Sequence, residues 1–417
     1  MKILIYGINF TPELTGIGKY TGEMAAWLAS RGHEVRVVTA HPYYPQWKVI
    51  GGAGYRREIL DRVNVCRCPL YVPSKPTGLK RILHLASFAL SSIPVMACQI
   101  FWKPNIVWVV EPALMCAPGA LLTAKLSRAN SWLHVQDLEV DAAFDLGLVR
   151  SSILRRAILL LERLLMNSFD KVSTISANML SRLNDKGISI KNLVLFPNWV
   201  DTSLINPAFH DVDSPFFLNY PRYRSEWHIP QKATVVLYSG NIGEKQGLGI
   251  VIEAAKKLAD RNDIYFILCG NGAAYNRLHK ISRGMANIHW IPLQPFERLS
   301  ELLSEADIHL LPQLVGAENL VMPSKLTGIF ASGRPVVTTA EPGSALYQSV
   351  THAAAGIIVP HNDVEAFSLA IVELADKPAL RYELGRSARK YAIEHMDINS
   401  ILLKFEFSLN QLNKKTP

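Results

Sequence analysis

The sequence has little cysteine, and none of it is arranged to hold a metal. Five cysteines occur in 417 residues, most of them inside apolar runs: Cys66, Cys68, Cys98, Cys116 and Cys269. No pair with zinc-ligand spacing is matched by a second pair. A scattered, odd-numbered set is typical of reduced thiols. We therefore expect a cytoplasmic protein with neither a zinc site nor a disulfide framework.

Long cationic runs and targeting patterns are also missing. The net charge is +9, yet no extended lysine or arginine run and no RNA-binding motif occurs, so we expect no nucleic-acid partner. The charge suits an anionic ligand or an anionic membrane face, although a mildly basic enzyme surface would account for it as well. The chain opens on a strand-like run at Lys2 without the charged-then-apolar design of a signal peptide. The acidic pairs Glu139/Asp141 and Asp211/Asp213 are too short a pattern to predict a metal.

One segment is nearly devoid of charge. Leu79–Trp102 has Lys80 and Arg81 near its start, and Lys103 follows it. Its length approaches that of a membrane span, but Pro94 and several polar residues weaken that interpretation. A buried helix of an α/β domain and a helix lying on a membrane surface, with its basic ends near anionic lipid, both remain open. A full span is the least favoured of the three.

Apolar strands alternate with amphipathic helical patterns in two separate series. The first series has strand-like runs at 2–8, 34–40, 63–72, 105–110, 131–136, 171–176 and 192–198, and the second at 234–240, 264–270, 287–293, 307–313, 335–340 and 356–360. Such alternation predicts parallel sheets covered by helices on both faces. We expect two Rossmann-like, doubly wound domains at 1–205 and 232–390, facing each other across a ligand cleft. A proline- and aromatic-rich linker at 206–231 joins them, and a helix at 391–417 follows.

Each series opens with a strand, a glycine loop containing a lysine, and a helix. The first loop, "TPELTGIGKYTGEM" (11–24), has neither Walker nor dinucleotide spacing, because Glu13 and Thr21 stand where those motifs need glycine. The second, "SGNIGEKQG" (239–247), places Gly240, Gly243 and Lys245 before a helix. Glycine backbone, a helix N-terminus and a lysine together favour phosphate binding over a surface turn.

Two further stretches contain candidate functional residues. "HVQDLEVD" (134–141) places His134 and Asp137 at a strand end, where they could contact a sugar hydroxyl or orient an acceptor, although a lone histidine is often structural. "PSK" ends on Lys325 in the first turn of a predicted helix. The helix dipole disfavours a cation there, so a nearby anion would explain it.

These residues together resemble a GT-B glycosyltransferase of the large retaining family that includes bacterial polysaccharide and mannosyl transferases. The resemblance covers nearly the whole chain and rests on "ELTGIGKYTGEMAAWLASRGHEVRVVT", "FPNWVD", "LYSGNIGEKQGL" and "MPSKLTGIFASGRPVV". A closer similarity, in "HPYYPQW" and "QDLEVDA", is to fucosyltransferases of colanic acid biosynthesis. It implies metal-independent transfer from a nucleotide sugar, with GDP-fucose favoured, to a polyprenyl-diphosphate-linked saccharide. It also implies attachment through Leu79–Trp102 to the inner face of the cytoplasmic membrane. No cofactor is expected, since the nucleotide sugar is a substrate.

The resemblance also implies a set of site residues. His134 and Asp137 would be catalytic, although Gln136 could occupy the family histidine position instead. The donor-binding residues would be Gly16, Gly18, Gly240, Asn241, Lys245, Gly270, Asn271, Leu293, Glu318, Ser324 and Lys325. The chain departs from the family at Asn241, where an arginine is usual, and at Leu320 and Gly328, where the Glu-x7-Glu motif would fall.

Two other functions share this architecture. A nucleotide-sugar epimerase would convert its substrate without an acceptor, and the apolar segment disfavours it. A non-catalytic nucleotide-sugar-binding component of a polysaccharide assembly complex is favoured only by the departures at Asn241, Leu320 and Gly328.

Overall fold

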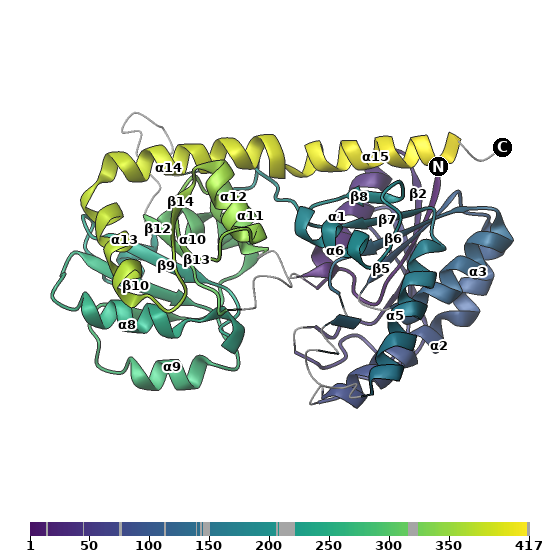
Figure 1. The fold of residues 1–417 in the computed structure, drawn as a ribbon, viewed down its shortest axis with the longest axis horizontal. Helices are drawn as coiled ribbons and strands as arrows, with labels where there is room; N and C mark the ends of the chain where they lie inside the picture. The colour runs from purple at the N-terminus through teal and green to yellow at the C-terminus, as the bar shows by residue number, and fades with distance from the viewer. Residues whose placement is uncertain are drawn as a thin grey trace. The chain divides into compact units, whose positions relative to one another are not determined.

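The computed structural model describes residues 1–417 except 14–15, 45, 75–76, 112–113, 139, 142–143, 145–150, 206, 208–221, 316–323 and 415–417. The chain divides into two compact units. The first comprises 1–197 together with 401–417, and the second comprises 198–400. Each unit is built around its own parallel sheet (Figure 1).

The sheet of the first unit has the strand order β3-β4-β2-β1-β5-β6-β7-β8. Its strands are β1 (Lys2–Tyr6), β2 (Glu34–Ala40), β3 (Arg56–Leu60), β4 (Val63–Cys68), β5 (Ile106–Glu111), β6 (Asn130–Val135), β7 (Lys171–Thr174) and β8 (Leu193–Leu195). All neighbours pair in parallel except β3 with β4. Every residue of β5 is buried, as expected of a central strand covered on both faces.

Helices cover both faces of this sheet. They are α1 (Ile17–Ser30), α2 (Gly78–Trp102), α3 (Ala117–Ser127), α5 (Ser152–Asn167), α6 (Ala177–Asp185) and most of α15 (Ile398–Lys414). Helix α15 adds Phe405 to the core of the unit. The Phe405 ring stacks on Phe196 at 4.3 Å and meets the edges of Trp108 and Trp132.

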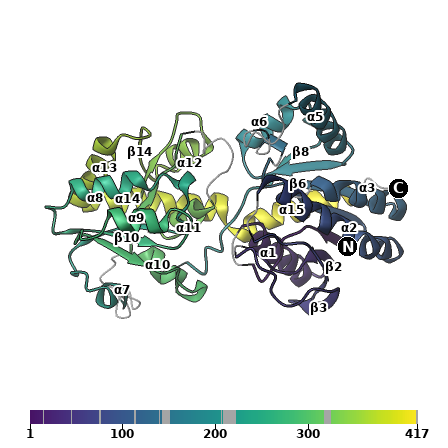
Figure 2. The same cartoon turned by 90° about the horizontal axis from the view of Figure 1, so that it is seen from below.

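The sheet of the second unit is wholly parallel, in the order β11-β10-β9-β12-β13-β14. Its strands are β9 (Thr234–Ser239), β10 (Ile264–Cys269), β11 (Ile288–Ile291), β12 (Ile308–Leu311), β13 (Val336–Thr339) and β14 (Gly356–Val359). Its helices are α7 (Arg222–Glu226), α8 (Gly249–Lys257), α9 (Tyr275–Ile281), α10 (Leu299–Glu305), α11 (Lys325–Ala331), α12 (Ala345–Ala353), α13 (Val364–Asp376) and α14 (Pro378–Tyr391) (Figure 2).

Alternate residues of β9 face two different cores. Val236 and Tyr238 pack with residues of α8 and α13, whereas Val235 and Leu237 pack with residues of α7 and α10. A strand buried on both sides must be apolar at every position, and "TVVLYS" comes close to that.

The predicted pair of doubly wound parallel sheets is confirmed, and one strand was missed. Strand β3 has the sequence "RREIL", whose charges conceal its role as an antiparallel edge strand. It joins β4 through Asp61 and Arg62, both at positive φ (47° and 66°), as in a two-residue type I′ hairpin.

Candidate functional site

The first glycine loop follows β1 in the first unit and leads into α1. Gly16 is the residue preceding the helix and has a φ of 64°, which favours glycine. Gly18 lies against Glu13, and a Cβ at position 18 would fall 2.8 Å from Glu13 Cβ and Oε2. Lys19 lies 3.7 Å from Glu23 one turn further along α1. Both glycines of the motif thus have local structural causes.

Glu13 anchors this loop to the segment that follows β2. Its Oε1 accepts hydrogen bonds from the backbone N–H groups of Tyr43 and Tyr44, both at 3.0 Å, and its Oε2 accepts one from Asn9 Nδ2 at 2.9 Å. Burial raises the pKa of the Glu13 carboxyl, and these hydrogen bonds oppose the shift. The sequence showed Glu13 only as a departure from known glycine motifs, because Tyr43 and Tyr44, two of its three partners, lie about 30 residues further along the chain.

More polar groups lie at the ends of β5 and β6. Glu111 is the buried last residue of β5, and its carbonyl oxygen accepts a hydrogen bond from Gln136 N–H at 3.3 Å. Asp137 follows Gln136 and is half-buried. Burial and the charges of Asp137 and Glu13 raise the pKa of the Tyr44 hydroxyl, so these carboxylates and Tyr44 share one electrostatic environment. The segments that follow β1, β2 and β6 thus place Glu13, Tyr44 and Asp137 in one polar region, which is suited to hydrogen-bonding sugar hydroxyls.

His134 lies in the core of the first unit. Its side chain is only 2% exposed, its Nδ1 is 2.8 Å from Ser173 Oγ, and its ring stacks on Trp108 at 5.4 Å. Burial lowers its pKa to about 3, so the imidazole is neutral at physiological pH. This placement supports packing rather than catalysis for His134. Gln136 and Asp137 are the polar residues at the strand end.

The second glycine loop follows β9 in the second unit. Gly240 has a φ of 130° and Gly270 a φ of 145°, and a Cβ at either position would overlap neighbouring atoms. Gly270 lies against the backbone of Gly240, and Ile242 N–H donates to the Asn271 carbonyl oxygen at 2.9 Å. The segments beginning at residues 240 and 270 are therefore packed backbone to backbone. The glycines permit this close approach.

Lys325, the first residue of α11, lies against this loop. Its Nζ donates to the Tyr238 hydroxyl and sits 4.2 Å from the Tyr238 ring centroid. Tyr238 in turn donates to the Asn241 carbonyl oxygen at 2.5 Å. A Cβ at Gly240 would overlap Lys325 Cε, so the glycine makes room for the lysine. Tyr238, unnoticed in the sequence, connects the glycine loop to Lys325.

The electrostatic state of Lys325 is unusual for a lysine. Burial lowers its pKa to about 7. No ion pair joins it to a carboxylate in the part of the chain that the structure describes. A half-buried cation held by an aromatic hydroxyl and ring is suited to receive an anion.

The remaining predicted donor residues occupy varied positions. Lys245 is exposed, and its carbonyl oxygen accepts from Leu314 N–H at 3.2 Å. Asn241, Asn271 and Ser324 are exposed near Lys325 or the two glycine segments, and Leu293 follows β11 with 64% of its side chain exposed. Glu318, Leu320 and both residues of the Asp211/Asp213 pair lie outside the described residues, as does Glu139.

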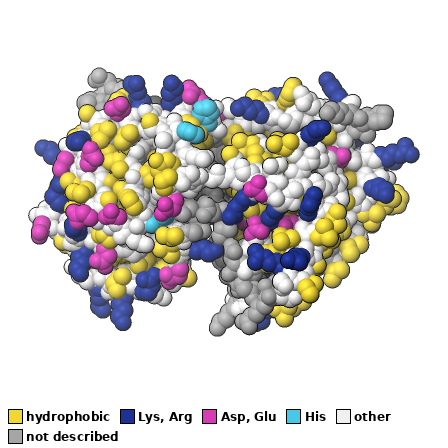
Figure 3. Space-filling model, viewed as in Figure 1, with side chains coloured by type: hydrophobic (Ala, Val, Ile, Leu, Met, Phe, Trp, Pro, Cys, Tyr) yellow, Lys and Arg dark blue, Asp and Glu magenta, His cyan; other side chains and the backbone are white. Residues whose placement is uncertain are grey.

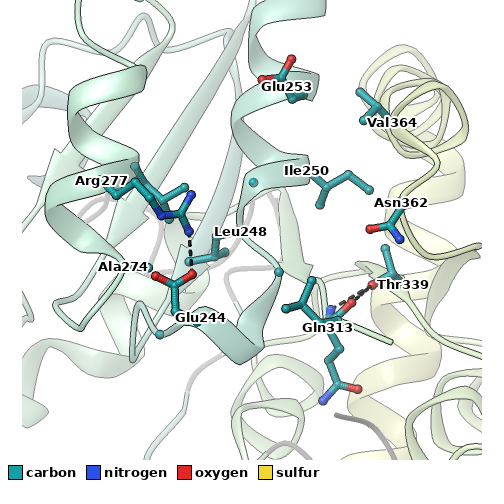
Figure 4. A pocket seen from close by; sticks show the side chains of 15 residues that line it. Glu244, Leu248, Ile250, Glu253, Ala274, Arg277, Gln313, Thr339, Asn362 and Val364 are labelled. Carbon is teal, nitrogen blue, oxygen red and sulfur yellow. Dashed lines mark hydrogen bonds and ion pairs between the residues drawn. The ribbon is translucent and has the colours of Figure 1, made fainter. Parts of the chain in front are cut away.

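A pocket of about 370 Å³ borders the second glycine loop (Figure 4). Gly243, Glu244 and Gly247 line it from the loop, and Gln313 and Thr339 line it from the ends of β12 and β13. Glu244 forms a 2.6 Å ion pair with Arg277, which also lines the pocket. Neither lysine of the candidate donor site is among the lining residues, so this pocket lies beside that site. Among the described residues, no group of His, Cys, Asp and Glu side chains could hold a metal ion.

Comparison with known proteins agrees with this arrangement. Residues 15–199 match the model of the glycosyl transferase 4-like domain, and residues 219–391 match that of glycosyl transferases group 1. WcaI of Escherichia coli (strain K12), a glycosyl transferase named for colanic acid biosynthesis, is 44% identical over 97% of this chain and 98% of its own length.

Solved structures share the fold over the full length. Sucrose-phosphate synthase from Thermosynechococcus elongatus has a TM-score of 0.76 at 17% identity, covering 99% of this chain and 98% of its own. A glycosyltransferase from Rickettsia africae has a TM-score of 0.73 at 15% identity, covering 99% of each chain. The similarity to WcaI over nearly the full length agrees with the two Rossmann-like units and their glycine loops at strand ends. This chain belongs to the group 1 glycosyltransferases of the GT-B fold.

Proposed function

We propose that this enzyme transfers a sugar from a nucleotide diphosphate sugar, with GDP-fucose the favoured donor, to a polyprenyl-diphosphate-linked saccharide. The product would belong to an exopolysaccharide similar to colanic acid. The 44% identity to WcaI over nearly the whole chain supports this pathway, because WcaI is named for colanic acid biosynthesis. The preference for GDP-fucose rests on that similarity alone.

The arrangement of Lys325, Tyr238 and Gly240 is the observation that carries the donor site. Negative charge builds on the leaving diphosphate as the sugar–oxygen bond breaks. Lys325 supplies a cation beside a glycine loop whose backbone an anion can approach closely. Lys245, exposed on the same loop, can supply a second positive charge. In this proposal the two lysines supply the positive charge that an arginine usually supplies at the position of Asn241.

The proposed reaction retains configuration and needs no metal. The bond between the sugar C1 and the diphosphate oxygen breaks through an oxocarbenium-like transition state. The acceptor hydroxyl oxygen bonds to C1 on the same face, and its proton passes to the departing diphosphate. A charge-stabilising donor in such a site is typically worth on the order of 3 kcal/mol, about a hundredfold in rate.

The polar strand ends of the first unit suit the acceptor. Asp137 and Gln136 can accept and donate hydrogen bonds to sugar hydroxyls, and Glu13 holds the neighbouring loop in place. We assign Asp137 to orienting the acceptor hydroxyl. His134 receives no role in the reaction, because its side chain lies in the core.

The enzyme would work on the cytoplasmic face of the membrane as a peripheral protein. Helix α2 is long and apolar enough to cross a membrane by length and composition. Only 22% of the residues in its apolar 18-residue stretch are buried inside the protein. The expectation of a buried helix therefore fits this segment poorly. A helix lying on the membrane surface would place the enzyme where a lipid-linked acceptor is presented.

A thermal-shift panel tests the donor site. Wild type, Lys325→Met, Lys245→Ala and the control Lys280→Ala, an exposed lysine on α9, are heated with GDP-fucose, GDP-mannose and UDP-sugars. A ligand at a hundred times its Kd stabilises a protein by about 2.7 kcal/mol. We expect one nucleotide sugar to stabilise wild type and Lys280→Ala, and to lose that effect in Lys325→Met. Equal stabilisation of Lys325→Met would contradict the assignment.

Turnover then separates the transferase from its rivals. Radiolabelled donor is incubated with a lipid-linked saccharide acceptor, and both products are followed. Transfer to lipid supports the proposal. Interconversion of the free nucleotide sugar without acceptor would indicate an epimerase, and donor binding without any turnover would indicate a non-catalytic component.

A further inference from the structure

Helix α2 buries unusually many polar side chains for a helix whose exposed side is apolar. Of its six buried residues, Phe88, Met96 and Trp102 are apolar and His84, Ser92 and Gln99 are polar. The Ser92 hydroxyl is hydrogen-bonded to the Tyr6 hydroxyl at 2.5 Å, and His84 Nδ1 lies 2.6 Å from the Tyr71 carbonyl oxygen.

The opposite side of α2 is apolar. Leu79, Leu83, Leu90, Ile93 and Phe101 are all exposed, Leu79 at 71% and Phe101 at 87%. Their spacing of three to eight residues keeps them in one stripe along the helix. Single exposed apolar residues are common on proteins, but a continuous stripe of large ones marks an interaction surface.

Helix α5 repeats this pattern. Its one carboxylate, Glu162, is buried, and both carboxylate oxygens accept from Lys186 Nζ at 2.9 Å. Five of its eight leucines and isoleucines are exposed by between 51% and 79%: Ile153, Leu154, Leu160, Leu161 and Leu164. Helix α3 adds exposed leucines at positions 122 and 126.

The three helices belong to one layer. Helices α2, α3 and α5 lie in the connections β4→β5, β5→β6 and β6→β7, which all advance in the same direction across the sheet. Right-handed crossovers therefore place them on one face. Figure 1 shows them together on one side of the sheet, and Figure 3 shows apolar side chains gathered in the region of α2 and α3. We call this layer the α2–α3–α5 face.

The exposed charges of these three helices are of one sign. The exposed charged residues of these helices, all of whose positions the structure describes, are Lys80, Arg81, Lys125, Arg155, Arg156 and Arg163. Glu162 is the one acidic residue among them, and it is buried and paired with Lys186, which also pairs with Asp141. Apolar stripes accompanied only by cations complement an anionic lipid surface. Two copies of the face would repel each other, which disfavours a symmetric dimer through it.

We propose that the α2–α3–α5 face docks on an anionic phospholipid bilayer, and that α5 is a second membrane-contacting helix in addition to α2. The leucines enter the interfacial region, while the arginines and lysines contact lipid phosphates. This deepens the membrane component of the proposed function and does not depend on which donor the enzyme uses. It extends the contact beyond Leu79–Trp102 to a helix that the sequence did not single out.

Vesicle co-sedimentation tests the role of α5. Full-length wild type and the double variant Leu160→Gln/Leu164→Gln are mixed with vesicles of phosphatidylcholine alone or with added phosphatidylglycerol. The control is Leu369→Gln on α13 of the second unit, which matches Leu164 in exposure at 58%. We expect wild type and the control to bind anionic vesicles, and the double variant to bind at least about tenfold more weakly per leucine replaced. A second variant, Arg155→Gln/Arg156→Gln, should bind anionic vesicles more weakly. Added salt should weaken the binding of wild type to these vesicles in the same way.

Several results would overturn the proposal. They are unchanged vesicle affinity in the α5 double variant, equal binding to neutral and anionic vesicles, or a wild-type dimer that the leucine substitutions dissociate. Nucleotide-sugar thermal shifts measured on the same samples keep this test separate from the proposed function. Loss of vesicle binding with an intact donor shift concerns the face alone, whereas an absent donor shift in wild type concerns the donor site alone.

Discussion

Replacing Lys325 by methionine should stabilise the empty protein while abolishing donor binding. Methionine keeps much of the apolar stem and removes the charge. The lysine pKa falls from its ordinary 10.5 to about 7 because the ammonium is buried. Below pH 7 the lysine is charged in both the folded and the unfolded chain, so burying that charge lowers the free energy of unfolding by its full amount. Stability should rise with pH between about 7 and 10.5, since the unfolded chain holds more protons there.

The magnitude follows from the same shift. Each pKa unit corresponds to about 1.4 kcal/mol. A drop of this size therefore limits the destabilisation of the fold by the buried Lys325 charge to about 5 kcal/mol. Lys325 is half-buried and keeps its contact with Tyr238, so we expect Lys325→Met to gain about 2 kcal/mol at pH 6. Urea unfolding at pH 6 and pH 9 measures this gain. It should shrink at the higher pH.

Donor affinity should depend on pH with the opposite sign. Bound diphosphate favours charged Lys325, so binding above pH 7 requires proton uptake and should weaken by up to tenfold per pH unit. GDP-fucose is a suitable probe, because its phosphates do not titrate near neutrality. Calorimetry between pH 6 and pH 9 provides the affinities, with Lys280→Met as control. A pH-independent affinity in wild type, or a Lys325→Met protein less stable than wild type at pH 6, would refute this account.

Three further substitutions test other contacts. Gly240→Ala should lose the donor thermal shift and destabilise the second unit by about 1–3 kcal/mol. The added Cβ would overlap Lys325, and the φ of 130° is strained for alanine. Gly249→Ala, where the added Cβ has open space around it, is the control in urea unfolding. Phe405→Ala should destabilise the first unit by about 3–5 kcal/mol through loss of an aromatic core side chain, and a loss under about 1 kcal/mol by the same method would contradict that packing. Asp137→Asn should lower kcat at least tenfold in the lipid-acceptor assay while the donor thermal shift stays intact; an unchanged kcat would remove Asp137 from the reaction.

Local sequence patterns determined the architecture of this protein. The strands lie close to the predicted runs because buried parallel strands must be apolar along their whole length, as in β5 and β9. The glycine loops at Gly16 and Gly240 were visible for a similar reason, since a positive φ beside a helix or strand end favours glycine wherever it occurs. Strand β3 was hidden because a charged edge strand does not share the apolar pattern.

Tertiary structure alone decided what the candidate site residues can do. Burial lowers the pKa of Lys325, and Tyr238 and the glycine loop against which it packs lie more than 80 residues earlier in the chain. His134 looked available at a strand end, but it is enclosed by rings that include Phe196 and Trp108. The apolar run of α2 was evident in the sequence, but only its packing showed that His84, Ser92 and Gln99 are buried while a stripe of large apolar residues, Leu79 and Phe101 among them, is exposed. Burial and side-chain charge depend on contacts between residues distant in sequence, and a local pattern carries no record of those contacts.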